Sequence, residues 1–184
     1  MFGIFLVLLA LAMIGLLVFN YNTIIKLRNR IENSWAQIDV QLQRRHDLIP
    51  NLVETAKGYL KHEQETFKEI TKARSKAMQA PGVEQQADAE NLLNDAMSKF
   101  YLAVEDYPEL KANQNFLELQ EEITSTENKI AFARQSYNDQ VMFFNKKIEV
   151  FPSNLLANHF GFKKRDYFEI DDKTREVPEV DFSN

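Results

Sequence analysis

The chain opens with a long stretch of apolar residues. The first charged side chain is Lys26, and residues 2–19 hold only Phe, Gly, Ile, Leu, Val, Ala and Met. As an α-helix, this stretch spans roughly 27 Å, close to the thickness of the hydrocarbon core of a bilayer. No basic segment precedes the stretch and no small-residue exit follows it, as a cleaved signal peptide requires. Residues 1–20 are therefore predicted to be an uncleaved transmembrane anchor.

Beyond the apolar stretch, apolar residues recur every three or four positions, as in amphipathic helices. Residues 21–46 form the first such segment, and neither Gly nor Pro separates it from the anchor. We therefore expect one rigid helix to run from the membrane into the domain. The stripe of this segment consists of Ile24, Leu27, Ile31, Trp35, Ile38 and Leu42.

Pro50 predicts the end of this first helix. It has no backbone N–H, and its ring crowds the carbonyl of the residue four positions earlier. Asp47 suits a helix N-cap, which places Pro50 in the first turn of a new helix. We expect a turn here, far from the membrane, with a kinked but continuous helix as the alternative. Arg44 and Arg45 belong to this turn, read as a solvated capping turn or, alternatively, as a docking tip for a partner.

Three further amphipathic segments are predicted, over residues 48–79, 84–105 and 112–150. The breakers Ala80-Pro81-Gly82 and Tyr107-Pro108 separate them. Four helical segments with short connections predict an all-α fold, an antiparallel up-down four-helix bundle over residues 21–162 continuous with the anchor. The three stripes consist of Val53, Ala56, Leu60, Phe67, Ile70 and Ala77; Leu92, Leu93, Ala96, Phe100 and Ala103; and Phe116, Leu119, Ile123, Ile130, Tyr137, Val141, Phe144 and Ile148.

The end of the chain changes character after residue 150. In the up-down order, the 80–82 loop and the end of the fourth helix return to the membrane. The short apolar segment that follows is interpreted as a cap on the open end of the bundle or, alternatively, as a contact with lipid headgroups. Residues 163–184 are predicted to be a loosely ordered extension with an acidic tail. The candidate membrane contacts are Phe151, Leu155, Phe160 and Phe162.

Four charged residues interrupt the apolar stripes, namely Glu63 and Arg74 in one segment and Glu127 and Arg134 in another. A lone buried charge is costly, so these side chains are expected to pair across helices where they face inward. We interpret them as residues that fix helix register or extend their charges to solvent at the stripe edge. A site for an ionic ligand or a proton-linked switch is the alternative.

The composition limits which kinds of binding or catalytic site the chain can hold. The chain has 22 Lys and Arg against 27 Asp and Glu, a net charge of −5, and no cysteine. The net negative charge argues against nucleic-acid binding, and the absence of cysteine excludes disulfides and thiolate metal sites. His62-Glu63 begins a zinc-protease motif, but Thr66 stands where its second histidine belongs. We therefore predict no catalytic, cofactor or metal site, no small-molecule substrate and no enzyme.

Basic residues directly after the anchor set its predicted orientation. Lys26, Arg28 and Arg30 follow the apolar stretch within a few residues. Lys and Arg near a membrane span favour the cytoplasmic side. The sequence therefore predicts a single-pass protein of the cytoplasmic membrane, with its N-terminus outside and its helical domain in the cytoplasm.

A series of motifs resembles the LemA family of bacterial membrane-anchored proteins, over nearly the whole chain to about Phe162. The resemblance implies a four-helix bundle behind one membrane span and no established enzymatic activity. It also implies relatives that act in membrane organisation, including magnetosome formation, and others encoded beside membrane peptidases. The motifs are Arg44-Arg45 with Asp47-Leu48-Ile49-Pro50-Asn51-Leu52-Val53-Glu54, Lys57-Gly58-Tyr59, His62-Glu63, Tyr107-Pro108-Glu109-Leu110-Lys111-Ala112, Thr126-Glu127-Asn128-Lys129-Ile130-Ala131, Ala133-Arg134-Gln135-Ser136-Tyr137-Asn138, Phe144-Asn145 and Phe151-Pro152.

Together, the sequence favours a non-catalytic scaffold or adaptor at the bacterial membrane, whose partners are the lipid bilayer, copies of itself and other membrane proteins. A regulatory subunit of a membrane peptidase or sensor kinase is one alternative. An oligomeric membrane-remodelling protein is another.

Overall fold

The computed structural model describes residues 1–169, and within this range it contains helices and no strand. The predicted acidic tail, residues 171–184, lies outside the described residues. The all-α prediction and the long apolar N-terminal helix are confirmed. The helices are α1 (Phe2–Lys57), α2 (Gln64–Gln79), α3 (Gly82–Val104), α4 (Pro108–Lys111), α5 (Gln114–Glu149) and α6 (Ser153–Phe160).

Helix α1 does not end at Pro50, so the turn predicted at residues 47–50 is wrong and the continuous-helix alternative holds. Pro50 lies inside α1, which runs on to Lys57. Ile49, Leu52 and Val53 on either side of the proline are buried in the core. Burial of each such side chain contributes about 1.5–3 kcal/mol, which together exceeds the cost of about 3 kcal/mol for a proline inside a helix. The distal turn lies instead at residues 58–63.

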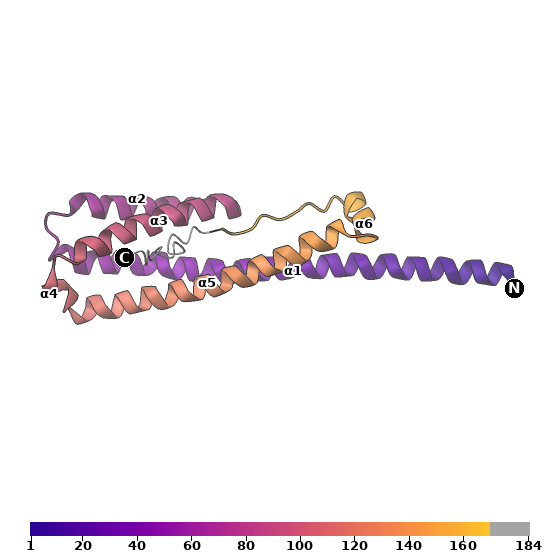
Figure 1. The fold of residues 1–184 in the computed structure, drawn as a ribbon, viewed down its shortest axis with the longest axis horizontal. Helices are drawn as coiled ribbons and strands as arrows, with labels where there is room; N and C mark the ends of the chain where they lie inside the picture. The colour runs from indigo at the N-terminus through magenta and orange to yellow at the C-terminus, as the bar shows by residue number, and fades with distance from the viewer. Residues whose placement is uncertain (170–184) are drawn as a thin grey trace, which may run out of the picture.

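Two antiparallel helix pairs build the domain (Figure 1). Helices α1 and α5 pack along most of their common length, and the α2–α3 hairpin covers their distal half. The membrane-proximal position expected for the 80–82 loop is therefore wrong. Helix α2 is about 24 Å long and α5 about 54 Å, so the hairpin turns back midway along the domain. Gly82 makes this tight turn with φ +81°, a conformation that favours glycine.

The apolar stripes predicted from the sequence form the core. Ile24, Ile31, Ile38 and Leu42 of α1 are buried, as is most of the α5 stripe. Leu92 is an exception, because it is exposed on α3 while its neighbour Leu93 is fully buried. Adjacent residues of a helix point about 100° apart, so only one of the two can face the core.

Residues 163–169, here called the strap, run back along the domain in an extended form, and the loose order predicted for them is wrong. The amide of Asn145 bonds the backbone of Arg165 twice, at 2.9 Å each. Asn138 does the same for Phe168, at 2.9 and 3.2 Å. The Phe168 ring is fully buried and packs edge-on against Trp35, with centroids 5.3 Å apart.

Candidate functional site

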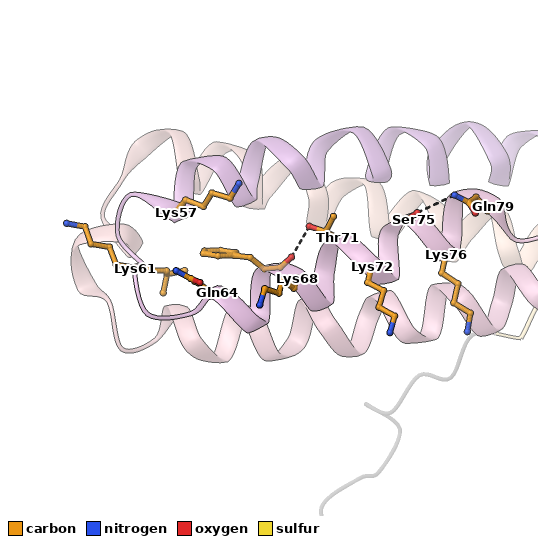
Figure 2. Close-up of a pocket in the computed structure, with 11 residues that line it drawn as sticks. Lys57, Lys61, Gln64, Lys68, Thr71, Lys72, Ser75, Lys76 and Gln79 are labelled. Carbon is orange, nitrogen blue, oxygen red and sulfur yellow. Dashed lines mark hydrogen bonds between the residues drawn. The ribbon is translucent and has the colours of Figure 1, made fainter.

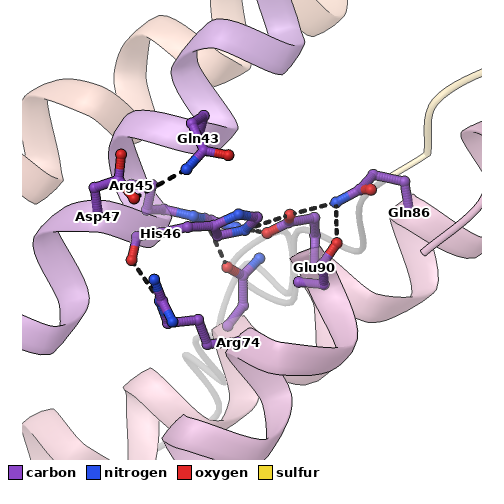
Figure 3. Close-up of polar contacts among 9 residues, drawn as sticks. Gln43, Arg45, His46, Asp47, Arg74, Gln86 and Glu90 are labelled. Carbon is purple, nitrogen blue, oxygen red and sulfur yellow. Dashed lines mark hydrogen bonds and ion pairs between the residues drawn. The ribbon is translucent and has the colours of Figure 1, made fainter. Parts of the chain in front are cut away.

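A buried polar cluster joins α1 to α3 in the middle of the domain (Figure 3). Its centre is Glu90 of α3, whose side chain is 0% exposed. Arg45 of α1 forms an ion pair with Glu90 Oε2. An ionised carboxylate only accepts hydrogen bonds, so His46 Nε2–H donates to Glu90 Oε1, at 2.9 Å. Gln86 Nε2 donates to the same oxygen at 2.7 Å.

The surroundings of Glu90 keep it ionised. Burial alone would raise the pKa of its carboxyl group, but the hydrogen bond from His46 and the charge of Arg45 outweigh burial. The pKa of Glu90 is therefore lowered below its ordinary value. Arg45 is satisfied further by Asn94, whose Oδ1 accepts from its Nη1 at 3.0 Å. The result is a buried, charge-paired contact between α1 and α3.

Helix α5 faces this cluster with Glu127. Burial raises the pKa of Glu127, and the charge of Arg45 opposes the rise. Burial also raises the pKa of Tyr101 on α3, with the Glu127 charge adding to it. Glu127 is thus the carboxyl at this contact whose ionised form the fold disfavours. The central side chains are shielded from solvent, so the cluster offers no open surface for a substrate.

Arg74 of α2 completes the cluster from the other side. Its Nε donates to the backbone oxygen of His46 at 2.5 Å (Figure 3). Of the other charges predicted on the stripes, Glu63 lies at the N-cap of α2 and accepts from Thr66 at 3.3 Å. Arg134 lines the groove that holds the strap. Arg74 and Glu127 thus both lie at the buried cluster, whereas Glu63 and Arg134 lie elsewhere on the domain.

The residues assigned to a distal turn lie mid-helix instead. Arg44 is exposed and pairs with Glu122 of α5 at 2.6 Å. Asp47 is also exposed and accepts from Gln43 at 2.9 Å. Arg45 is buried, because it faces α3, where it contacts Glu90 and Asn94.

Sequence reasoning missed Glu90. It lies three positions before the stripe residue Leu93 and directly after Ala89, both of which are buried. A charge on the buried side of a segment was the available signal, and it was the same signal that identified Glu127.

A second polar contact fixes the domain at the end of the apolar stretch. Asn20 is buried, and its Oδ1 accepts from Lys147 Nζ at 2.8 Å and from Ser153 Oγ at 2.9 Å. Asn20 Nδ2 donates to the carbonyl of Leu16 at 2.9 Å. The ends of α5 and α6 are thereby attached to α1 where its apolar stretch stops.

Aromatic and aliphatic side chains surround this junction. Phe160 and Phe162 pack against Tyr21 of α1 with tilted rings, whose centroids lie 4.9 and 6.1 Å from that of Tyr21. Phe160 remains half exposed, and Phe151 and Leu155 are more exposed still. Of the four candidate membrane contacts, Phe160 and Phe162 thus also pack on α1, while Phe151 and Leu155 point outward.

Within the described residues, no protein surface buries the side chains of the apolar stretch. Residues 2–19 are exposed throughout, and their helix contains an 18-residue window of mean hydropathy 3.0 that is 0% buried. Helix α1 is the one helix of the described range that is long and apolar enough to cross a membrane. Lys26, Arg28 and Arg30 follow on the part of α1 that enters the domain. Between residues 1 and 169 no cluster of His, Asp and Glu suits a metal ion.

Comparison with known proteins gives one family. The model of the LemA family matches residues 34–182. Protein LemA of Metamycoplasma hominis is 28% identical over 159 residues, which cover 83% of this chain and 72% of that protein. Magnetosome protein MamQ 2 of Paramagnetospirillum magneticum is 25% identical over 189 residues, covering 89% and 70%. Magnetosome protein MamQ of Magnetospirillum gryphiswaldense is 24% identical over 188 residues, covering 88% and 69%.

Proposed function

The chain belongs to the LemA family, and from this premise we propose that it is a non-catalytic scaffold, fixed in the bacterial cytoplasmic membrane by α1, whose four-helix bundle binds copies of itself. The apolar helix and the LemA and MamQ relatives support membrane association. None of the relatives' names describes an enzyme.

The observation that carries the proposal is the continuity of α1. One helix contains both the fully exposed apolar stretch and the core residues from Ile24 to Ala56. Asn20 holds α5 and α6 against this helix directly at the end of the stretch. A domain joined to its anchor in this way stands at a fixed height above the bilayer, which is what a scaffold requires. The basic residues Lys26, Arg28 and Arg30 favour the cytoplasmic side.

A groove between α1 and α5 supports self-association. Val40 and Phe132 line it, and their side chains are 62% and 75% exposed. Ala36 and Ala133 leave room beside them. Two neighbouring exposed apolar residues beside a groove form a surface that a second copy can cover by two-fold symmetry.

The mass of the protein extracted in mild detergent tests self-association. The scaffold predicts a homo-oligomer for the wild type and a monomer for Phe132→Glu, because two charges would be buried at a symmetric contact. Leu102→Glu is the matched control, since Leu102 is 73% exposed on α3 outside the groove. A wild-type monomer overturns self-association, and a stable complex with a membrane peptidase or kinase would support the regulatory alternative.

Attachment and orientation have their own test. The full chain should stay in the membrane pellet after alkaline carbonate washing. The chain has no cysteine, so Leu102→Cys creates a single label site. It should react with a membrane-impermeant maleimide only after the cells are opened. Recovery in the supernatant contradicts the anchor, and labelling of intact cells contradicts the cytoplasmic domain.

A further inference from the structure

A groove lined by lysines runs along α2 and the distal end of α1 (Figure 2). Its volume is about 1010 Å³, and Leu60 and Phe67 contribute to its lining. The polar lining includes Thr71 and Ser75. Five exposed lysines, here called the groove lysines, surround it, namely Lys57, Lys61, Lys68, Lys72 and Lys76.

Charge is segregated at this groove. The chain has a net charge of −5, yet no acidic residue belongs to the lining. Lys57 pairs with Glu54, and Lys68 pairs with Glu65 at 3.3 Å, and neither carboxylate belongs to the lining. Lys72 and Lys76 have no carboxylate partner within the described residues. A positive surface with apolar side chains in its lining fits an extended acidic segment that carries some apolar residues.

The end of the strap lies close to the lysine groove. Asn138 holds Phe168 in place, and Glu169 lines the same hollow as Glu84 and Asp88 of α3. Helix α3 begins at Gly82, directly after the last turn of α2 and its Lys76. The described chain therefore ends near the C-terminal end of α2.

The remaining residues have the matching composition. Residues 170–184 contain five acids against two bases, together with Val177, Val180 and Phe182. Fully extended, they span at most about 50 Å, twice the roughly 24 Å of α2. They are long enough to pass the 80–82 loop and lie along the groove.

We propose that the lysine groove is the docking site for the chain's own C-terminal segment, residues 170–184. The inference depends on the groove and the strap and not on the proposed scaffold role. A tethered segment has an effective concentration in the millimolar range, so weak pairs suffice to hold it. Surface ion pairs are screened by salt, so the segment leaves the groove at high ionic strength. The groove lysines then become free for another acidic partner.

Lysine acetylation followed by mass spectrometry tests the docking on the full chain in detergent micelles. The comparison is a variant that neutralises the segment, with Asp171→Asn, Asp172→Asn, Glu176→Gln, Glu179→Gln and Asp181→Asn. An effective concentration about one to four times the dissociation constant predicts that Lys68, Lys72 and Lys76 react roughly two- to five-fold more slowly in the wild type. The difference should vanish in about 1 M salt.

Lys146 on α5 is the control lysine, because it is exposed near the C-terminal end of α5 and lines neither this groove nor the groove proposed for self-association. Its rate should be the same in both proteins. Equal rates at the groove lysines in wild type and variant would overturn the proposal.

Zero-length carbodiimide cross-linking identifies the occupant. In a mixture of isotope-labelled and unlabelled protein, the proposal predicts amide links between residues 170–184 and the groove lysines within single chains. The triple variant Lys68→Gln, Lys72→Gln, Lys76→Gln should lose most of these links, and Lys146→Gln should keep them. Links that join labelled to unlabelled chains would assign the groove to the tail of a second copy and overturn the intrachain docking.

Discussion

Arg74 donates a hydrogen bond to the backbone oxygen of His46, the oxygen that Pro50 leaves without its helical donor. In an α-helix the N–H of residue 50 would bond the carbonyl of residue 46, and proline has no N–H. The guanidinium from α2 supplies the missing donor at 2.5 Å. Arg74, which was predicted to interrupt an apolar stripe, and Pro50, which was predicted to end a helix, thus take part in the same contact.

A double-mutant cycle tests this contact. Arg74→Met keeps the length of the side chain and removes the donor, so it should lower the free energy of unfolding by about 1–3 kcal/mol. Pro50→Ala restores a backbone donor to the His46 carbonyl. In that background Arg74→Met should cost clearly less, as measured by urea unfolding in detergent micelles followed by circular dichroism. An equal cost in both backgrounds would show that the two residues act independently.

Glu90 should be the most sensitive charged residue of the domain. Glu90→Gln leaves the Arg45 guanidinium buried without its counter-charge, which costs about 3–5 kcal/mol of unfolding free energy. Glu122→Gln is the matched control, because it breaks an exposed ion pair with Arg44. Its cost should stay within about 1 kcal/mol. Similar losses for the two variants in urea unfolding would contradict the role assigned to burial.

The pH dependence of stability should have opposite signs at Glu90 and Glu127. The folded-state pKa of Glu90 is lowered, so its contribution is present above the unfolded pKa and is lost as the pH falls through the folded value. The folded-state pKa of Glu127 is raised, because burial disfavours its charge. Its cost is therefore full above the folded pKa, shrinks as the pH falls, and disappears below the unfolded pKa of about 4.3.

Glu127→Gln should thus stabilise the protein at pH 7 and have little effect near pH 4. Glu90→Gln should destabilise it at pH 7, with a loss that shrinks as the pH falls. Thermal unfolding of the wild type and both variants across this range measures the two trends. A stabilising effect of Glu127→Gln that persists unchanged at low pH would show that volume or hydrogen bonding, and not charge, is responsible.

The parts of the fold that the sequence predicted are those that local periodicity determines. Stripe residues such as Ile38, Phe100 and Val141 are buried because a residue every three or four positions faces the same side of a helix. The termination at Tyr107-Pro108 was predictable for the same reason, since it depends on adjacent residues. The core and most helix ends follow from such signals.

Features that depend on distant partners could not be predicted in this way. The passage of α1 through Pro50 depends on Arg74, which lies on another helix. The strap has no apolar periodicity, and its order depends on polar groups of α5. These are the amides of Asn138 and Asn145 and the hydroxyl of Tyr137, which donates to the Asp166 backbone oxygen at 3.0 Å. An asparagine on a helix surface gives no sign of the backbone it will bind.

The strap offers a direct optical test, because Phe168 packs against Trp35, the one tryptophan of the chain. Phe168→Ala should shift the emission of Trp35 to longer wavelength, as the indole gains contact with water. The loss in unfolding free energy should be smaller than the roughly 3–5 kcal/mol typical of a buried Phe→Ala change, because the strap can detach while the helices stay folded. Tyr167→Ala is the matched control, since Tyr167 is exposed on the same strap, and it should leave the emission unchanged.

The double variant Asn138→Ala, Asn145→Ala removes the four hydrogen bonds between these amides and the strap backbone, and it keeps the Phe168 ring. If the amides hold the strap, this variant gives the same red shift, whereas an unshifted spectrum would mean that the Phe168 ring and the hydrogen bond from the Tyr137 hydroxyl to the Asp166 backbone oxygen hold the strap without them.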